Sequence, residues 1–115
     1  MTEKIWTIQE IQTLLNSNNP FTIARAIVAI YNRQTFEEKE QGITKKRNNV
    51  GFNAFDAQYF TRPYGEHNFK NIDPILRFVK NKNPKDKEWI LSRLDKLQKR
   101  IWKYSAQLTD IANSN

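Results

Sequence analysis

Five basic residues in the C-terminal third of the chain stand at spacings that suit one face of a helix. They are Arg93, Lys96, Lys99, Arg100 and Lys103, which follow one another at intervals of three, three, one and three residues. Side chains at such intervals gather on one face of an α-helix, and only one acid, Asp95, intervenes. Cations on a rigid helix can neutralise the phosphate groups of a polyanion, so this face is a predicted binding surface.

A second basic cluster is the triplet Lys45-Lys46-Arg47. The residues after it are rich in amide and aromatic side chains, namely Asn48, Asn49, Phe52, Asn53 and Phe55. Cations beside amides and aromatic rings suit phosphate contact combined with base stacking. The alternative is that the rings belong to the core and the triplet to a solvated loop. For Phe55 and Phe60 we prefer the core interpretation.

The chain has few side chains that are suited to catalysis: it has one histidine, His67, and no cysteine. His67 beside Glu66 could act as a general base oriented by a carboxylate, but geometry and not adjacency defines such a pair, so a surface-loop histidine is the preferred interpretation. Structural zinc needs Cys or further His ligands. The three glycines are too dispersed for a phosphate-binding loop. We therefore predict a non-enzymatic protein without a metal or a cofactor.

The net charge of the 115-residue chain is +7, and it is concentrated in the C-terminal half. Residues 61 to 115 hold twelve Lys and Arg against six Asp and Glu, a net charge of +6. This asymmetry favours an anionic partner for that half, with a merely solvated surface as the alternative.

No signal-peptide pattern and no membrane-spanning apolar run occurs in the sequence. We expect a single cytoplasmic domain, residues 1–115, without membrane contact.

Apolar residues near the C-terminus recur at alternating spacings of four and three. The series is Ile90, Leu94, Leu97, Ile101, Tyr104, Leu108 and Ile111. Such a heptad seam, placed after the helix-starting pair Asn83-Pro84, predicts one long basic helix. The seam can pack within the chain or against a second copy, and the second case would give a homodimer.

Helix caps predict further helices. Thr7 and Glu10 form a capping box for a helix over about residues 8–17. Asn19-Pro20 and Asp73-Pro74 each place a capping residue before a proline, which is typical of a helix start.

The segment over about residues 43–72 differs from the rest, because it holds two of the three glycines and many aromatics. Asn53 could cap a short helix that carries Phe55, Tyr59 and Phe60. The chain is therefore predicted to be all-α: a compact bundle of four or five helices with this loop-rich, aromatic segment and a long basic C-terminal helix.

Residues spread along the chain also form a recognisable pattern. They are Arg33-Gln34-Thr35, Glu38, Thr44, Asn48, Gly51-Phe52, Asp56-Ala57, Lys103-Tyr104, Gln107-Leu108 and Ile111-Ala112. The pattern resembles a module of unassigned function in small proteins of phages and mobile elements, sometimes associated with helicase-like or DNA-handling proteins. The likeness spans about residues 24 to 112, and it implies nucleic-acid transactions. This chain departs from it at Asn48-Asn49-Val50, where the module commonly has Asn-Gly.

The same pattern has a physical interpretation as a structural clasp. Gly51 would supply a backbone conformation that a Cβ forbids, and Asp56 would accept at a helix start or pair with Arg33. Tyr104 and Gln107 lie one helical turn apart and could hold the Gly51-Phe52 loop by hydrogen bonds. Whether the pattern is structural or functional stays open.

Together these features predict a basic protein of a phage or mobile element that acts in the cytoplasm of a bacterial host. We expect it to bind nucleic acid, chiefly by phosphate neutralisation. The predicted contacts are Lys45, Lys46, Arg47, Arg93, Lys96, Lys99, Arg100 and Lys103. The alternative is a protein-binding inhibitor of a host defence nuclease, of the anti-CRISPR type, whose partner is a nuclease or nucleoprotein complex.

Overall fold

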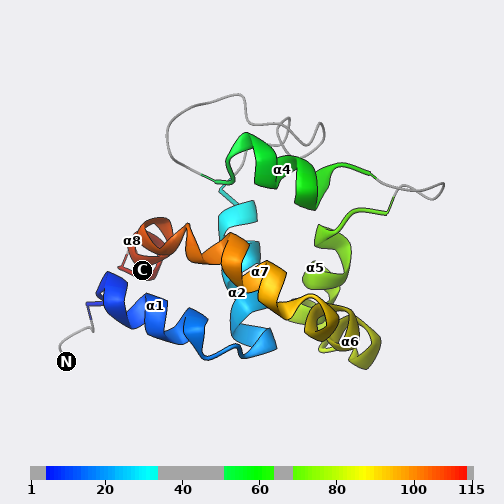
Figure 1. Cartoon of the computed structure of the whole chain (residues 1–115), viewed down its shortest axis with the longest axis horizontal. Helices are drawn as coiled ribbons and strands as arrows, with labels where there is room; N and C mark the ends of the chain where they lie inside the picture. Colours follow the sequence, from blue (N-terminus) through cyan, green and yellow to red (C-terminus); the bar gives the residue numbers. More distant parts are fainter. Residues whose placement is uncertain (1–4, 34–50, 64–68, 114–115) are drawn as a thin grey trace.

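The structure, a computed structural model, describes residues 5–33, 51–63 and 69–113. Within these ranges it contains seven helices and no strand, so the all-α prediction is confirmed (Figure 1). The helices are α1 (Ile8–Asn16), α2 (Pro20–Tyr31), α4 (Ala54–Thr61), α5 (Ile72–Asn81), α6 (Pro84–Ser92), α7 (Leu94–Trp102) and α8 (Ser105–Asn113). They are shorter and more numerous than the four or five that we expected.

The predicted caps start four of these helices. The Thr7 hydroxyl accepts from the Glu10 backbone at 3.2 Å while the Glu10 carboxylate accepts from the Thr7 backbone, which completes the capping box of α1. The side chains of Asn19, Asn53 and Asn83 likewise accept from backbone N–H groups in the first turns of α2, α4 and α6. Local sequence therefore determines where these helices begin.

Helix α2 is the central element of the bundle. Its side chains Ile23, Ala24, Ile27 and Ile30 are completely buried, and α5, α6, α7 and α8 all contact it. Figure 1 shows α7 crossing over α2, with α1 and α5 on opposite sides of the crossing. A helix with apolar residues on most of its surface is stable in such a position because neighbouring helices cover most of that surface.

The prediction of one long basic C-terminal helix is wrong, because three helices occupy that stretch. Arg93, with φ −122° and ψ 14°, departs from helical geometry and separates α6 from α7. A turn at residues 103–104 separates α7 from α8. The hydroxyls of Ser92 and Ser105 donate to the carbonyl oxygens of Trp89 and Trp102 at these junctions, an alternative to helical hydrogen bonding.

The heptad seam packs inside the chain, across these three helices. Ile90, Leu97 and Ile101 are at most 1% exposed, and Tyr104 and Leu108 are also buried. The bends let α6, α7 and α8 each contact α2, which a straight helix could not do over that length. The structure thus gives no support to a homodimer formed through this seam.

The aromatic segment docks on the bundle through α4 and the residues before it. Phe52 and Phe60 are buried, and their rings stack with centroids 4.7 Å apart. The core interpretation is correct for Phe60 but wrong for Phe55, whose surface is 69% exposed. Phe55 precedes buried Asp56 and Ala57 on α4 and points away from the core that they face.

Candidate functional site

The carboxylate of Asp56 is the centre of a buried polar cluster. Asp56 lies on α4 and is completely buried. Its Oδ1 accepts from Arg100 Nη1 at 2.7 Å, and its Oδ2 accepts from Lys103 Nζ at 2.8 Å and from the Tyr104 hydroxyl at 2.6 Å. All three donors come from the end of α7 and the turn that follows. Short charge-assisted hydrogen bonds of this kind are among the strongest in proteins.

Asp56 is a buried acceptor, and its carboxylate neither caps α4 nor pairs with Arg33. The side chain that caps α4 is Asn53, which accepts from the Asp56 backbone N–H at 2.9 Å. Arg33 donates instead to Gln107 Oε1 at 3.1 Å. Asp56 could not be assigned from sequence because its partners lie 44 to 48 residues away.

The protonation states in the cluster follow from burial and hydrogen bonding. Burial alone raises the pKa of Asp56, but the hydrogen bonds from Lys103, Tyr104 and Arg100 outweigh it and hold the pKa below the ordinary 3.8. Burial, together with the hydrogen bond to Asp56, raises the pKa of Tyr104 well above its ordinary value. The carboxylate is thus ionised and the phenol is a proton donor at neutral pH.

Gln107 on α8 holds the chain that leads into α4. Its Oε1 accepts from the Gly51 backbone N–H at 2.9 Å, and its Nε2 donates to the Gly51 carbonyl oxygen at 3.0 Å. Gly51 has φ 83°, a conformation that a Cβ disfavours. The Tyr104 hydroxyl accepts in turn from the Asn53 backbone N–H at 3.0 Å. The predicted tether of this loop by Tyr104 and Gln107 is confirmed.

We call this network the clasp. It consists of Arg33, Gly51, Asn53, Asp56, Arg100, Lys103, Tyr104 and Gln107. Six of the eight belong to the sequence pattern that runs from Arg33 to Ala112, so distant parts of that pattern meet at one place. The pattern members Gln34, Thr35, Glu38, Thr44 and Asn48 lie outside the described residues. The Asp56 carboxylate is completely buried, so solvent does not reach it directly.

Arg100 connects the clasp to a surface on α4 and α7. Its guanidinium lies 3.7 Å from the ring centroid of Tyr59 and 5.3 Å from that of Phe55, both within cation–π range. Its side chain is only 15% exposed, whereas that of Lys103 is 50% exposed. Arg100 is therefore mainly structural, and Lys103 presents part of its length to solvent.

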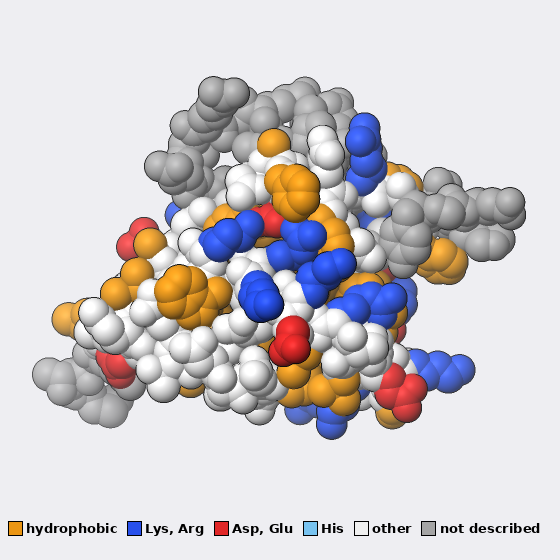
Figure 2. All heavy atoms as spheres, viewed as in Figure 1, with side chains coloured by type: hydrophobic (Ala, Val, Ile, Leu, Met, Phe, Trp, Pro, Cys, Tyr) orange, Lys and Arg blue, Asp and Glu red, His pale blue; other side chains and the backbone are white. Residues whose placement is uncertain are grey.

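The basic face is the surface formed by Lys96, Lys99 and Lys103. All three are exposed, and Lys96 Nζ lies 5.7 Å from the ring centroid of Tyr59. Figure 2 shows Lys and Arg side chains gathered in the middle of this view, over α7 and α4, with hydrophobic side chains beside them. One carboxylate, Asp56, is paired with two cations, so the surface above the clasp stays positive.

The remaining predicted contacts are Arg93 and the basic triplet. Arg93 is exposed, but its guanidinium donates to the Ser92 hydroxyl at 2.8 Å and packs 4.4 Å from the ring centroid of Trp89. It thus belongs to the junction between α6 and α7. The triplet Lys45-Lys46-Arg47 lies outside the described residues, as do Glu66 and His67.

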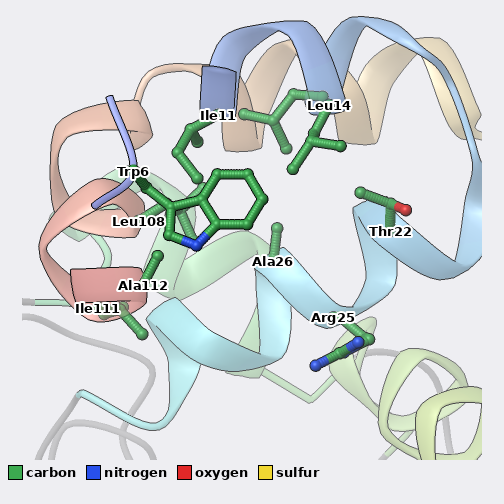
Figure 3. A pocket seen from close by; sticks show the side chains of 10 residues that line it. Trp6, Ile11, Leu14, Thr22, Arg25, Ala26, Leu108, Ile111 and Ala112 are labelled. Atoms are coloured by element: carbon green, nitrogen blue, oxygen red, sulfur yellow. The ribbon is translucent and has the colours of Figure 1, made fainter. Parts of the chain in front are cut away.

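An apolar cavity of about 400 Å³ lies elsewhere, between α1, α2 and α8. Figure 3 shows the Trp6 indole in it, between Ile11 on α1 and Ala26 on α2. Trp6 is held by Asn113, which accepts from its backbone N–H at 2.7 Å and donates to its carbonyl oxygen at 2.9 Å. The polar side chains in the lining are Thr22 and Arg25. With no acid or histidine in its lining, the cavity has no acid–base pair.

The described part of the chain contains no cluster of three or more His, Cys, Asp or Glu side chains that could hold a metal ion. No helix in residues 5–33, 51–63 or 69–113 is both long and apolar enough to cross a membrane.

The chain was compared with protein-family models, with curated proteins and with solved structures. None of them matches it. Its function must therefore be argued from the clasp and the basic face.

Proposed function

We propose that this is a non-enzymatic nucleic-acid-binding protein that contacts phosphate groups through the basic face. The observation that supports the proposal is the set of three exposed lysines on successive turns along α7 and at its C-cap, of which Lys103 is bonded to the Asp56 carboxylate of the clasp. A helix that is held by buried ion pairs loses little further freedom when it binds, and less loss of freedom means higher affinity.

The dimensions of the face suit a polyanion. Lys96 and Lys103 are seven residues apart, which corresponds to about 10 Å along a helix. Duplex DNA carries one negative charge per roughly 1.7 Å of axis, so about six phosphates fall within that length. Several phosphates are thus within reach of the three ammonium groups whatever the base sequence, and binding depends little on sequence.

The triplet Lys45-Lys46-Arg47 would extend the contact from the chain that precedes Gly51. The resemblance to modules of phages and mobile elements supports the proposal that the protein acts in the cytoplasm of a bacterial host. Arg93 and Arg100, which we also predicted as contacts, are engaged by Trp89 and by Asp56 respectively, so we propose that the three lysines make the main contacts.

A pair of matched variants tests the proposal. Lys96→Gln with Lys99→Gln removes two charges from the basic face without touching the clasp. Lys85→Gln with Lys87→Gln removes two exposed charges from α6 and leaves the same net charge. Fluorescence anisotropy with labelled duplex DNA, single-stranded DNA and RNA at about 50 mM salt, where phosphate contacts are strong, should show at least about ten-fold weaker binding for the first variant only.

Failure of the wild-type protein to bind any of the three nucleic acids at that salt concentration would reject the proposal. The basic face would then be a docking surface for an acidic protein, and the nuclease inhibitor would become the leading hypothesis. Equal losses in the two variants would show that net charge, and not the basic face, causes binding.

A further inference from the structure

Phe55 is a large aromatic side chain on α4 that the core of the protein does not cover. Its surface is 69% exposed, whereas Phe52 and Phe60 on either side of it in sequence are at most 1% exposed. Leaving a phenylalanine in water forgoes the free energy of its burial. An exposed ring beside a cationic surface offers a face on which a base can stack.

The ring has a rigid support. Its centroid lies 5.3 Å from the Arg100 guanidinium, which is itself fixed by the 2.7 Å hydrogen bond to Asp56 and by the Tyr59 ring 3.7 Å away. Phe55 and Asp56 are consecutive on α4. The clasp that anchors the carboxylate therefore also sets the direction of the ring.

Two lysines of the basic face share contacts with Arg100. Lys96 Nζ lies 5.7 Å from the ring centroid of Tyr59, on which Arg100 also packs, and Lys103 shares the Asp56 carboxylate with Arg100. An exposed ring near such cations can stack on a base while the cations bind the flanking phosphates. Bases in a duplex are stacked on one another and offer no free face, whereas bases in a single strand do.

We propose that Phe55 is a stacking platform and that the basic face takes single-stranded nucleic acid in preference to duplex. This inference rests on the proposed function, which supplies the phosphate contacts. Under this inference Phe55, which makes none of the proposed phosphate contacts, determines the preference for single strands over duplex.

The test uses two substitutions of Phe55 that differ in aromatic character. Phe55→Leu keeps an apolar side chain beside the Arg100 guanidinium but removes the π-face, and Phe55→Trp keeps a π-face. The probes are a short oligodeoxythymidylate, a duplex of the same length, and an oligonucleotide of the same length built of abasic sites. Circular dichroism of each variant checks that α4 is folded.

The wild-type protein should bind the oligodeoxythymidylate more tightly than the duplex. Phe55→Leu should weaken binding to the oligodeoxythymidylate by about 5- to 150-fold, the range for loss of one base–aromatic stack. It should change binding to the duplex and to the abasic strand less than about two-fold, since neither offers a free base face. Phe55→Trp should bind the oligodeoxythymidylate at least as tightly as the wild type.

Three results would overturn the inference in different ways. If Phe55→Leu binds all three probes like the wild type while Lys96→Gln/Lys99→Gln binds them weakly, the stacking platform is wrong and the phosphate-binding face stands. If Phe55→Leu weakens all three probes equally, the ring only supports Arg100. If the wild type binds none of the probes, both the inference and the proposed function fail.

Discussion

The Tyr104 hydroxyl donates a 2.6 Å hydrogen bond to the buried carboxylate of Asp56, which lies 48 residues earlier in the chain. This bond joins α4 to the turn between α7 and α8. The same carboxylate binds Arg100 and Lys103, so one buried charge both holds α4 in place and orients the cations above it. Stability and the proposed binding function therefore depend on a common group.

Removal of that charge should destabilise the protein. Asp56→Asn should lower the free energy of unfolding by roughly 2 to 4 kcal/mol, somewhat less than for a fully buried pair, because Lys103 can be resolvated when its partner is lost. Urea denaturation measures the change, and amide exchange in residues 51–57 should become faster. Asp95→Asn, an exposed acid on α7, is the control and should change stability by less than about 0.5 kcal/mol. Equal effects of the two substitutions would mean that the clasp is not stabilising.

The contribution of Asp56 should vanish in acid. Its pKa in the folded protein is below the ordinary value of 3.8, so the unfolded chain takes up a proton first as the pH falls. The stabilisation is complete above about pH 4 and is lost as the pH falls through the folded-state pKa. The difference in unfolding free energy between wild type and Asp56→Asn should therefore be constant from about pH 7 to 5 and shrink below about pH 4. A difference that grows in acid would contradict the ion-paired state.

Tyr104 should resist ionisation in alkali. Burial and the hydrogen bond to Asp56 raise its pKa, so its stabilisation is complete below about pH 10 and is lost above it. In an absorbance titration at the tyrosinate band, the folded wild type and Tyr104→Phe should give the same change at about pH 10 to 11. After unfolding, the wild type should show one additional tyrosinate. An extra tyrosinate already in the folded wild type would place Tyr104 in solvent.

Core and surface positions of α7 should differ sharply in their effect on stability. Leu97 is completely buried, and Leu97→Ala should cost about 2 to 5 kcal/mol. Lys96→Ala should cost less than about 0.5 kcal/mol because its side chain is exposed. Lys103→Ala should fall between them, since Lys103 is both half exposed and bound to Asp56. Thermal unfolding ranks the three, and a large loss for Lys96→Ala would contradict the assignment of faces.

The sequence was sufficient to predict the features of the fold that depend on local interactions. Thr7, Asn19, Asn53 and Asn83 cap their helices through atoms within three residues, and such contacts can be inferred from spacing alone. The burial of the seam could also be inferred, because its period is that of a helix.

Tertiary contacts decide what the sequence could not show. Neither glycine nor proline marks the break at Arg93, and the bend is set by the packing of α6 and α7 on α2. Phe55 points outward because the next residue, Asp56, points inward. Its carboxylate is bound there by Arg100, Lys103 and Tyr104. The spacing of the five basic residues could not show that Arg100 belongs to the clasp. Its buried partner, Asp56, lies 44 residues away in the sequence and does not affect that spacing.

The salt dependence of duplex binding tests the central claim most directly. Each phosphate neutralised contributes about −0.9 to the slope of log affinity against log salt, so the three lysines of the basic face predict a wild-type slope of about −3 or steeper. Lys96→Gln/Lys99→Gln should flatten the slope by about 2 units, and the α6 control Lys85→Gln/Lys87→Gln should leave it unchanged. A slope near zero, or one that only the α6 control flattens, would contradict binding through the basic face.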